Sequence, residues 1–178
     1  NSIRKVFDSV INHPELPVNT QKILDEFKAL ISMCRTTVDL LDKLHNMRLD
    51  DDSVYAHCLN VALLSRVIGK WLRFSPEERN VLTLCGLFHD IGKTSIPDEI
   101  LNKPGKYTDE EFVLIRQHPL FGYKNVKKLS IDERIKKAAL HHHERYDGSG
   151  YPQKLEGVDI DDYAGIIAIA DVYDATTA

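Results

Sequence analysis

Apolar residues recur every three or four positions through most of this 178-residue chain, which is the period of an amphipathic α-helix. No segment of useful length alternates between apolar and polar residues as a half-buried strand does, and no internal repeat is present. The sequence therefore predicts an all-α helical bundle. Helices are expected over residues 23–44, 54–72, 75 to about 92, 108–118, 132–143 and from 162 onward.

Helix start signals support these boundaries. The run Asp50-Asp51-Asp52-Ser53 is expected to cap the helix that begins at Val54. The segments Ser75-Pro76-Glu77-Glu78 and Thr108-Asp109-Glu110-Glu111 each place Glu three residues after Ser or Thr, as in a capping box. Residues 146–162 contain four glycines or prolines and little periodicity, so they are expected to form a loop.

The composition excludes several classes of function. With 27 acidic and 23 basic residues, the net charge is −4, and no run of five lysines or arginines occurs. Binding to duplex nucleic acid by phosphate neutralisation is therefore not expected. No apolar run approaches the roughly 18 residues that a membrane-spanning helix needs, and Asp8, Pro14 and Glu15 occupy the region where a signal peptide would be apolar. A cytoplasmic location is the expectation, although parts outside this chain could tether the protein to a membrane.

The three cysteines are interpreted as reduced thiols of the core. Cys34, Cys58 and Cys85 are widely spaced, lie in apolar segments and form no Cys-x-x-Cys pair. A metal or redox role is the less favoured alternative.

Several polar residues share the apolar faces of the predicted helices, where they are costly to bury unless something satisfies them. Any one of them alone is explained by a hydrogen-bonded core residue or a helix end. Together they point to a metal, because neutral imidazoles and carboxylates are ligands of first-row divalent ions and helical bundles hold such sites between facing helices. The seven candidates are His57, His89, Asp90, His118, His142, His143 and Asp171.

Seven ligands exceed the six positions of one octahedral ion, so two ions are expected. Adjacent His142 and His143 are about 100° apart around a helix and are therefore expected to reach two neighbouring ions. Asp90 is the natural bridging carboxylate. A pair of ions about 3.5–4 Å apart is an arrangement that cleaves phosphate esters, so the sequence predicts a buried two-metal hydrolytic centre inside the bundle.

Lys93 and the loop after His143 complete the candidate site. Lys93 follows Asp90 by three residues and is expected to neutralise a phosphate oxygen. An exposed lysine near the C-terminus of a helix is an equally good interpretation of Lys93 alone. The loop Asp147-Gly148-Ser149-Gly150-Tyr151-Pro152 is an ordinary turn by composition, but its position makes it the rim of the site.

The sequence resembles the HD superfamily of metal-dependent phosphohydrolases, and within it the HD-GYP subgroup. The matching motifs are His89-Asp90-Ile91-Gly92-Lys93 and His142-His143-Glu144 followed by residues 147–152. The first is shared across the superfamily, whereas the second is long and highly specific. The resemblance spans about residues 53–178.

The resemblance implies a helical bundle around two or three metal ions, often iron or manganese, with all seven candidates at ligand positions and Asp90 as the bridge. It implies Asp90 and Lys93 as catalytic residues, and Lys93, Gly148, Gly150, Tyr151 and Pro152 as substrate contacts. The family reaction is attack of metal-bound hydroxide on cyclic di-GMP, a bacterial second messenger, which gives the linear dinucleotide pGpG and in some members GMP.

Two departures from the family pattern bear on this expectation. Ser53 stands where some members have a third-site glutamate, so the resemblance favours two ions and weakens the case for conversion to GMP. The family usually continues past the last aspartate into a basic segment that helps to hold the substrate, and this sequence stops at Ala178, so a truncated domain with impaired substrate binding is expected.

The expected organisation is an N-terminal helical extension or linker over residues 1–50 and an HD-GYP domain over 51–178. The extension is expected to form helices that pack on the bundle or connect it to an upstream sensor or receiver domain, and a plain helical extension with no signalling role is the alternative. Other cyclic di-GMP signalling proteins are possible partners. The alternatives for function are an HD hydrolase of another nucleotide or phosphate ester, and a catalytically silent module that binds cyclic di-GMP. A purely structural zinc site is disfavoured because such sites favour cysteine and are closed.

Overall fold

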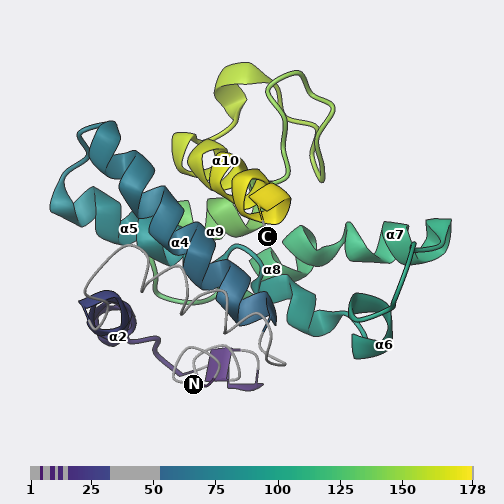
Figure 1. The fold of residues 1–178 in the computed structure, drawn as a ribbon, viewed down its shortest axis with the longest axis horizontal. Coiled ribbons are helices and arrows are strands. Elements are labelled where there is room, and N and C mark those ends of the chain that lie inside the picture. The colour runs from purple at the N-terminus through teal and green to yellow at the C-terminus, as the bar shows by residue number, and fades with distance from the viewer. Residues whose placement is uncertain (1–4, 6–8, 11, 14–15, 33–52, 178) are drawn as a thin grey trace.

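The computed structural model describes residues 5, 9–10, 12–13, 16–32 and 53–177 (Figure 1). Within these residues the chain is helical with no strand, and one isolated antiparallel bridge joins Asp147 and Glu156. The all-α prediction is confirmed. The helices are α2 (Thr20–Ser32), α4 (Ser53–Trp71), α5 (Pro76–Phe88), η1 (Ile91–Ser95), α6 (Asp98–Leu101), α7 (Asp109–Ile115), α8 (His118–Val126), α9 (Glu133–His141), η2 (Gly157–Asp159) and α10 (Asp162–Thr177).

Both predicted capping boxes form. The Ser75 hydroxyl accepts from the Glu78 backbone N–H at 3.2 Å, and the Glu78 carboxylate accepts from the Ser75 N–H at 2.7 Å. Thr108 and Glu111 make the same reciprocal pair at 3.2 and 2.7 Å. Each box satisfies backbone donors that a helix start otherwise leaves unpaired, so α5 and α7 begin where the sequence indicates.

The single helix expected over residues 108–118 is wrong, because the chain forms two helices there. Helix α7 ends at Ile115 and α8 begins at His118. Pro119 lies in the first turn of α8, and a proline can start a helix but cannot continue one, because it lacks the N–H and its ring clashes with the preceding turn. Phe112, which is expected on the apolar face of this helix, is 51% exposed.

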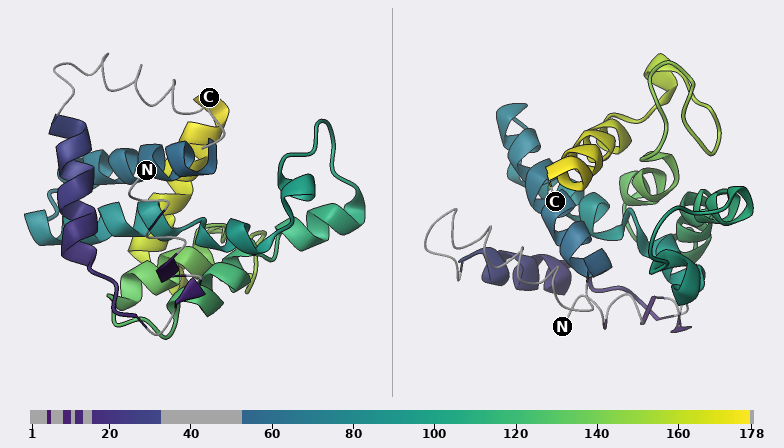
Figure 2. Two further views of the ribbon diagram at one scale, coloured as in Figure 1. Left: turned by 90° about the horizontal axis from the view of Figure 1, so that it is seen from below. Right: turned by 45° about the vertical axis from the view of Figure 1, so that its right-hand side comes forward.

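The core lies between α4, α5, α9 and α10. Helices α4 and α5 pack against each other along their length, α9 packs on α5, and α10 crosses both α4 and α9 (Figures 1 and 2). Leu59, Leu87, Ile135 and Ile167 are among the fully buried side chains that these four helices contribute. This packing brings the ends of α5 and α9 beside the middle of α10 and the first turns of α4.

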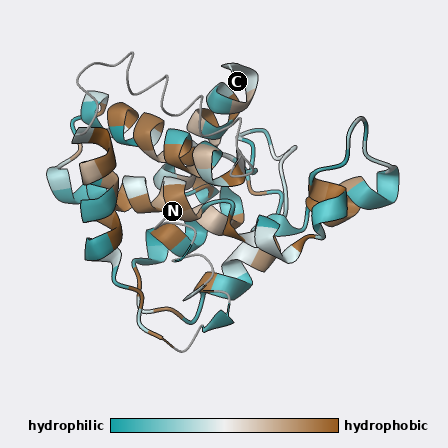
Figure 3. Ribbon diagram, turned by 60° about the horizontal axis from the view of Figure 1, so that its bottom comes forward, coloured by the Kyte–Doolittle hydropathy of each residue, from teal (hydrophilic) through white to brown (hydrophobic). Residues whose placement is uncertain are grey.

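Helices α6 and α7 form an arm that projects from the bundle, as Figures 1 and 2 show. The arm carries apolar stretches on its surface (Figure 3), including Val113, which is 60% exposed. The chain returns from the arm through α8, which packs on η1 and α9. The arm therefore leaves and re-enters the bundle next to His89, Asp90 and His118.

Helix α2 contributes to the same core as the rest of the bundle. Ile23, Leu24 and Phe27 on one face of α2 are buried, and α2 packs against α5. The predicted continuation of this region to Leu44 lies outside the described residues, and so does Cys34. The domain boundary at residues 50–51 stays a prediction.

Cys58 and Cys85 are buried free thiols, as predicted. Burial raises the pKa of each thiol well above its usual range, which keeps them protonated and unreactive. Among the described helices, none is both long and apolar enough to cross a membrane.

Candidate functional site

The seven predicted metal ligands converge inside the bundle, five of them from helix boundaries and two from within helices. His57 lies in the second turn of α4 and Asp171 in the middle of α10. The others occupy helix boundaries: His89 is the C-cap of α5, Asp90 the N-cap of η1, His118 the first residue of α8, His142 the C-cap of α9, and His143 the next residue.

The structure brings all seven together in three overlapping groups, and within each group the ligating atoms lie within 4.8 Å of one another. One group combines His57, His89 and Asp171, and another combines His118, His142 and His143. The third group joins the first two through His89, Asp90 and His142. This arrangement provides two three-residue sites with a shared carboxylate between them.

The Asp90 carboxylate faces both groups. Its Oδ2 lies 3.5 Å from His57 Nε2 and 3.3 Å from His89 Nε2. Its Oδ1 lies 3.2 Å from His118 Nε2 and 3.7 Å from His142 Nε2. A carboxylate with one oxygen toward each histidine pair has the orientation that bridging two cations requires.

His142 and His143 differ from the expectation for an ideal helix. Their ring centroids are 4.3 Å apart, and both belong to the same group as His118. Helix α9 ends at His141, and the His142 backbone stays in the αR region with φ −63° and ψ −14°. The structure thus groups His142 and His143 together, where the sequence predicted that they reach two neighbouring ions.

Backbone carbonyls orient three of the imidazoles. The Nδ1 atoms of His89, His118 and His142 lie 2.7, 2.8 and 3.0 Å from the carbonyl oxygens of Gly86, Ile115 and Ala138. A carbonyl only accepts, so each Nδ1 carries the proton and each Nε2 presents its lone pair to the centre. Outer contacts of this kind fix the tautomer and direction of metal-binding histidines.

Asp174 orients His57 in the same way, and sequence reasoning missed it. Its Oδ2 accepts from His57 Nδ1 at 2.7 Å, and the residue is 5% exposed. Asp174 follows Asp171 by three residues on α10, so both carboxylates share one helix face. That spacing was the available signal in the sequence.

The residues fit a divalent cation. His89 Nε2 and Asp90 Oδ1 are buried, with no hydrogen-bond partner among the described residues, which is costly unless a ligand satisfies them. The Nε2 atoms of His118 and His142 lie 3.1 Å apart, and both present lone pairs because both Nδ1 atoms are protonated. A cation between these two atoms would remove the repulsion between their lone pairs, and the donor set suits manganese, iron or zinc.

The electrostatics of the site keep the carboxylates ionised. Burial disfavours the charge of Asp90, but the Lys93 ammonium and the neighbouring imidazoles outweigh it and hold the Asp90 pKa well below its usual range. Burial likewise acts to lower the pKa of Lys93, and the Asp90 charge overcomes it and raises the pKa to about 12. Lys93 Nζ donates to Asp90 Oδ2 at 2.5 Å.

The imidazoles divide into two electrostatic classes. Burial, reinforced by neighbouring histidines, lowers the pKa of His142 to about 4 and that of His143 to about 2, so both are neutral and able to bind a metal. Burial also acts to lower the pKa of His57, but hydrogen bonds to Asp171 and Asp174 raise it to about 9. At neutral pH His57 therefore carries a proton that a bound cation would displace.

A cavity of about 570 Å³ opens beside these residues. Its volume is in the range of small-molecule sites, and it combines metal-ligand candidates with two cationic side chains. The lining residues are His57, Lys93, His143, Arg145, Asp171, Val172, Ala175 and Thr176. Arg145 and Thr176 were not singled out from the sequence, because nothing in their local pattern distinguishes them from surface residues.

The four predicted substrate contacts of the 147–152 loop do not line this cavity. Gly148 adopts a φ of 75° and lies against Glu156, and Gly150 lies against the backbone of residues 144–145. The Tyr151 ring stacks on His143, and Pro152 follows a cis peptide bond. Direct substrate contact by these residues stays a prediction.

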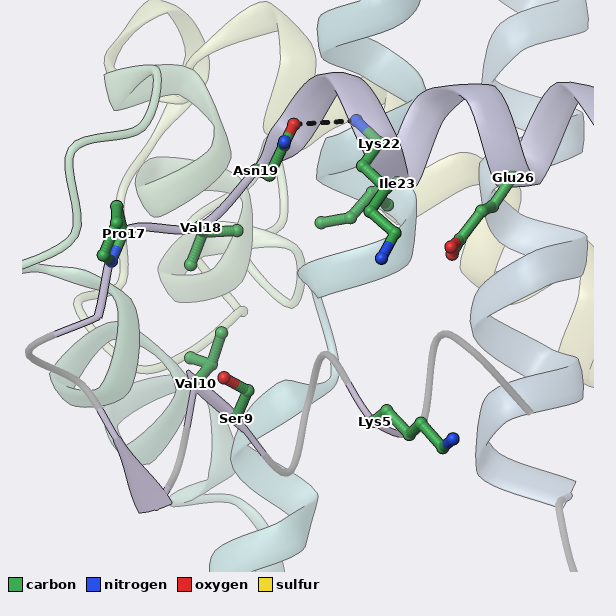
Figure 4. A pocket seen from close by; sticks show the side chains of 9 residues that line it. All are labelled: Lys5, Ser9, Val10, Pro17, Val18, Asn19, Lys22, Ile23 and Glu26. Atoms are coloured by element: carbon green, nitrogen blue, oxygen red, sulfur yellow. Dashed lines mark hydrogen bonds between the residues drawn. The ribbon is translucent and has the colours of Figure 1, made fainter.

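A second cavity, of about 240 Å³, lies between the N-terminal residues and α2 (Figure 4). Its side chains include Lys5, Lys22 and Glu26, and Lys22 N–H donates to Asn19 Oδ1 at 2.9 Å. No histidine or cysteine lines it.

Comparison with protein families and curated proteins gives a consistent picture. The HD domain family matches residues 17–178. The chain is 40% identical over 162 residues to a Pseudomonas aeruginosa protein named cyclic di-GMP phosphodiesterase, an alignment that covers 88% of this chain and 37% of that protein. It is 35% identical to a Vibrio cholerae protein named 3′3′-cGAMP-specific phosphodiesterase 1, with 93% of this chain and 37% of the relative covered.

A third relative is a Xanthomonas campestris protein named cyclic di-GMP phosphodiesterase response regulator RpfG. The two sequences are 35% identical, and the alignment covers 87% of this chain and 41% of that protein. The chain thus spans well under half the length of these relatives. Among solved structures, an HDG"Y"P protein from Bdellovibrio bacteriovorus superposes with a TM-score of 0.76 at 23% identity, covering 96% of this chain and 56% of that one. That similarity supports the fold.

Proposed function

We propose that this chain, which belongs to the HD domain family, hydrolyses cyclic di-GMP to the linear dinucleotide pGpG. The observation that carries this proposal is the Asp90 carboxylate, which turns one oxygen toward each histidine group beside an open cavity. The names of the relatives support a cyclic dinucleotide as the substrate. A cytoplasmic location is part of the same proposal, since the substrate is an intracellular messenger.

Two divalent ions, iron or manganese, are proposed to occupy the groups of His57, His89 and Asp171 and of His118, His142 and His143, with Asp90 shared. Bound there, the ions would act as Lewis acids on a phosphoryl oxygen and lower the pKa of water. Ser53 begins α4 four residues before His57 and offers no carboxylate for a third ion. Two ions and a pGpG product are therefore the proposal, with further cleavage to GMP a secondary possibility.

The side chains around the cavity position the substrate. Lys93 stays protonated at neutral pH because its pKa is about 12, and its ammonium, already beside Asp90, offers charge to a phosphate oxygen. Arg145 adds a second cation to the cavity wall, and a guanidinium binds phosphate in a bidentate manner. The imidazoles of His142 and His143 are neutral and do not attract an anion. Lys93 and Arg145 are therefore the side chains that attract the anionic substrate.

Hydrolysis of 3′3′-cGAMP is the second candidate function. It is favoured by the 35% identical relative named for that substrate, whose match covers 93% of this chain. A regulatory domain is also proposed among the parts of the protein outside this chain, because one relative is named a response regulator. Its input would control the activity of the site.

The test is a hydrolysis assay with the protein loaded with Mn²⁺ or Fe²⁺. Cyclic di-GMP, 3′3′-cGAMP, pGpG and mononucleotides are supplied separately, and products are resolved by chromatography. We expect pGpG from cyclic di-GMP, loss of both ions and of turnover in Asp90→Ala, and full metal content with about 10²–10³-fold slower turnover in Lys93→Ala.

Four outcomes would contradict parts of this proposal. Turnover of mononucleotides alone would make the chain a different HD hydrolase, and preferential turnover of 3′3′-cGAMP would make the second candidate function the correct one. Binding of cyclic di-GMP without cleavage by the metal-loaded protein would make it a silent module. Loss of metal from Lys93→Ala would refute the role assigned to Lys93.

A further inference from the structure

His143 is held differently from the other four imidazoles of the cluster. His57, His89, His118 and His142 each have Nδ1 hydrogen-bonded to an oxygen outside the three metal groups. The His143 imidazole makes no hydrogen bond with a described residue, and its Nδ1 lies 3.8 Å from Asp171 Oδ2. Ring contacts therefore fix the direction of this imidazole: His118 and His142 contact it from within its own group, and one further ring contacts it from outside the seven candidates.

Tyr151 provides that contact. Its ring stacks on the His143 imidazole with a centroid distance of 4.7 Å and an interplanar angle of 23°. Its backbone N–H donates to the His143 carbonyl at 3.1 Å, so the same two residues are joined by main chain and by rings. Arg116 lies over the Tyr151 ring, with Cζ 4.4 Å from the centroid, which ties the ring to the segment between α7 and α8.

The loop is constructed so that Tyr151 reaches this position. Glu144 is 2% exposed, and its two carboxylate oxygens accept from the backbone N–H groups of Gln153 at 2.6 Å and Leu155 at 3.0 Å. Gly150 lets the loop approach the main chain, since a Cβ there would lie 2.5 Å from the Glu144 Cα. These contacts clamp the loop on both sides of Tyr151.

We propose that Tyr151 is a positioning residue for His143, and that Arg116 holds the tyrosine ring in place. The proposal rests on the assignment of His143 as a metal ligand. Its consequence is that the loop supports the site of His118, His142 and His143, and leaves the site of His57, His89 and Asp171 to other contacts. Tyr151 then acts on metal binding and not primarily on substrate contact.

The test measures binding of Mn²⁺ by the metal-free protein, in the absence of any nucleotide, by calorimetry and by metal analysis after gel filtration. We expect Tyr151→Leu to weaken one of the two binding events about 10–100-fold, as loss of an outer contact to a ligand does. Tyr151→Phe keeps the stacking ring and should bind both ions normally. Tyr146→Leu is the matched control, because Tyr146 belongs to the same loop and is 79% exposed.

Arg116→Met provides a second variant if Tyr151→Leu does not fold, which thermal unfolding of the metal-free proteins will show. It removes the cation over the ring and should weaken the same binding event to a smaller degree. Wild-type Mn²⁺ affinity in a folded Tyr151→Leu variant, or in Arg116→Met if the first variant is unfolded, would overturn the proposal. A raised KM for cyclic di-GMP in that variant would assign Tyr151 to substrate binding instead. Because no nucleotide is present in the binding test, its result is independent of whether cyclic di-GMP is the substrate.

Discussion

At the scale of single residues, the site depends on outer contacts that hold each ligand. A carbonyl oxygen fixes His89, His118 and His142, and each such contact leaves Nε2 as the atom available to a cation. His57 is instead held by the Asp174 carboxylate, which makes the imidazole more basic as well as directing it. His57 should therefore be the imidazole whose cation affinity depends most on one side chain.

Replacement of Asp174 by Ala tests this dependence. The change removes the acceptor at 2.7 Å from His57 Nδ1, so we expect Mn²⁺ affinity at one site to fall about 10–100-fold. Competition with a chelator of known affinity measures the effect. Asp174→Asn retains a carbonyl oxygen that can accept the hydrogen bond, so its Mn²⁺ affinity should fall less than that of Asp174→Ala. Equal affinities for wild type and Asp174→Ala would show that the hydrogen bond has no role in metal binding.

At the scale of elements, helix ends contribute more of the candidate ligands than helix faces do. Five of the seven candidate ligands lie at helix boundaries, where the chain changes direction and neighbouring residues can turn toward one point. The turn between α5 and η1 places His89 and Asp90 together, and close packing of η1 on α8 brings in His118. Gly92 is what permits that packing.

Replacement of Gly92 by Ala should therefore damage stability and the site together. The added Cβ would lie 1.9 Å from the His118 carbonyl oxygen and 2.4 Å from Gly122 N, so the backbone of η1 or α8 must shift. We expect a loss of about 1–3 kcal/mol in the free energy of unfolding, measured by urea denaturation, and weaker metal binding because Asp90 and His118 flank the contact.

Gly165→Ala is the matched control for this change. Apart from its chain neighbours and the backbone of its own helix, no heavy atom of the described residues lies within 4 Å of its added Cβ. Gly165 lies inside α10, where alanine favours the helix by up to about 1 kcal/mol. We expect unchanged or higher stability. Equal free energies of unfolding for Gly92→Ala and wild type would mean that η1 and α8 need no close approach.

At the scale of the whole molecule, the histidine and aspartate cluster joins elements that are distant in the sequence. It connects α4, α5, α8, α9 and α10 at one point of the core, and without a cation it leaves buried polar atoms unsatisfied. A cation that binds only the folded protein must therefore stabilise the entire bundle.

Metal removal should lower the thermal stability of the protein. At a Mn²⁺ concentration about 100 times the dissociation constant, the stabilisation is about 2.7 kcal/mol, which for a chain of 178 residues raises Tm by about 5–10 °C. Calorimetry with Mn²⁺ and with a chelator measures the difference, and Asp90→Ala should show none. The same Tm for wild type in both conditions would contradict a metal site in the core.

The sequence by itself determined the helical class, both capping boxes and the set of residues that meet in the core, because hydrophobic periodicity and capping are local properties of the chain. It predicted Asp90 between two groups from ligand chemistry alone. Tertiary structure decided the break before α8, the pairing of His142 with His143, the contact of Asp174 with His57 and the place of Tyr151 against His143. These depend on where helices end and on which distant segments pack together, and no local period carries that information.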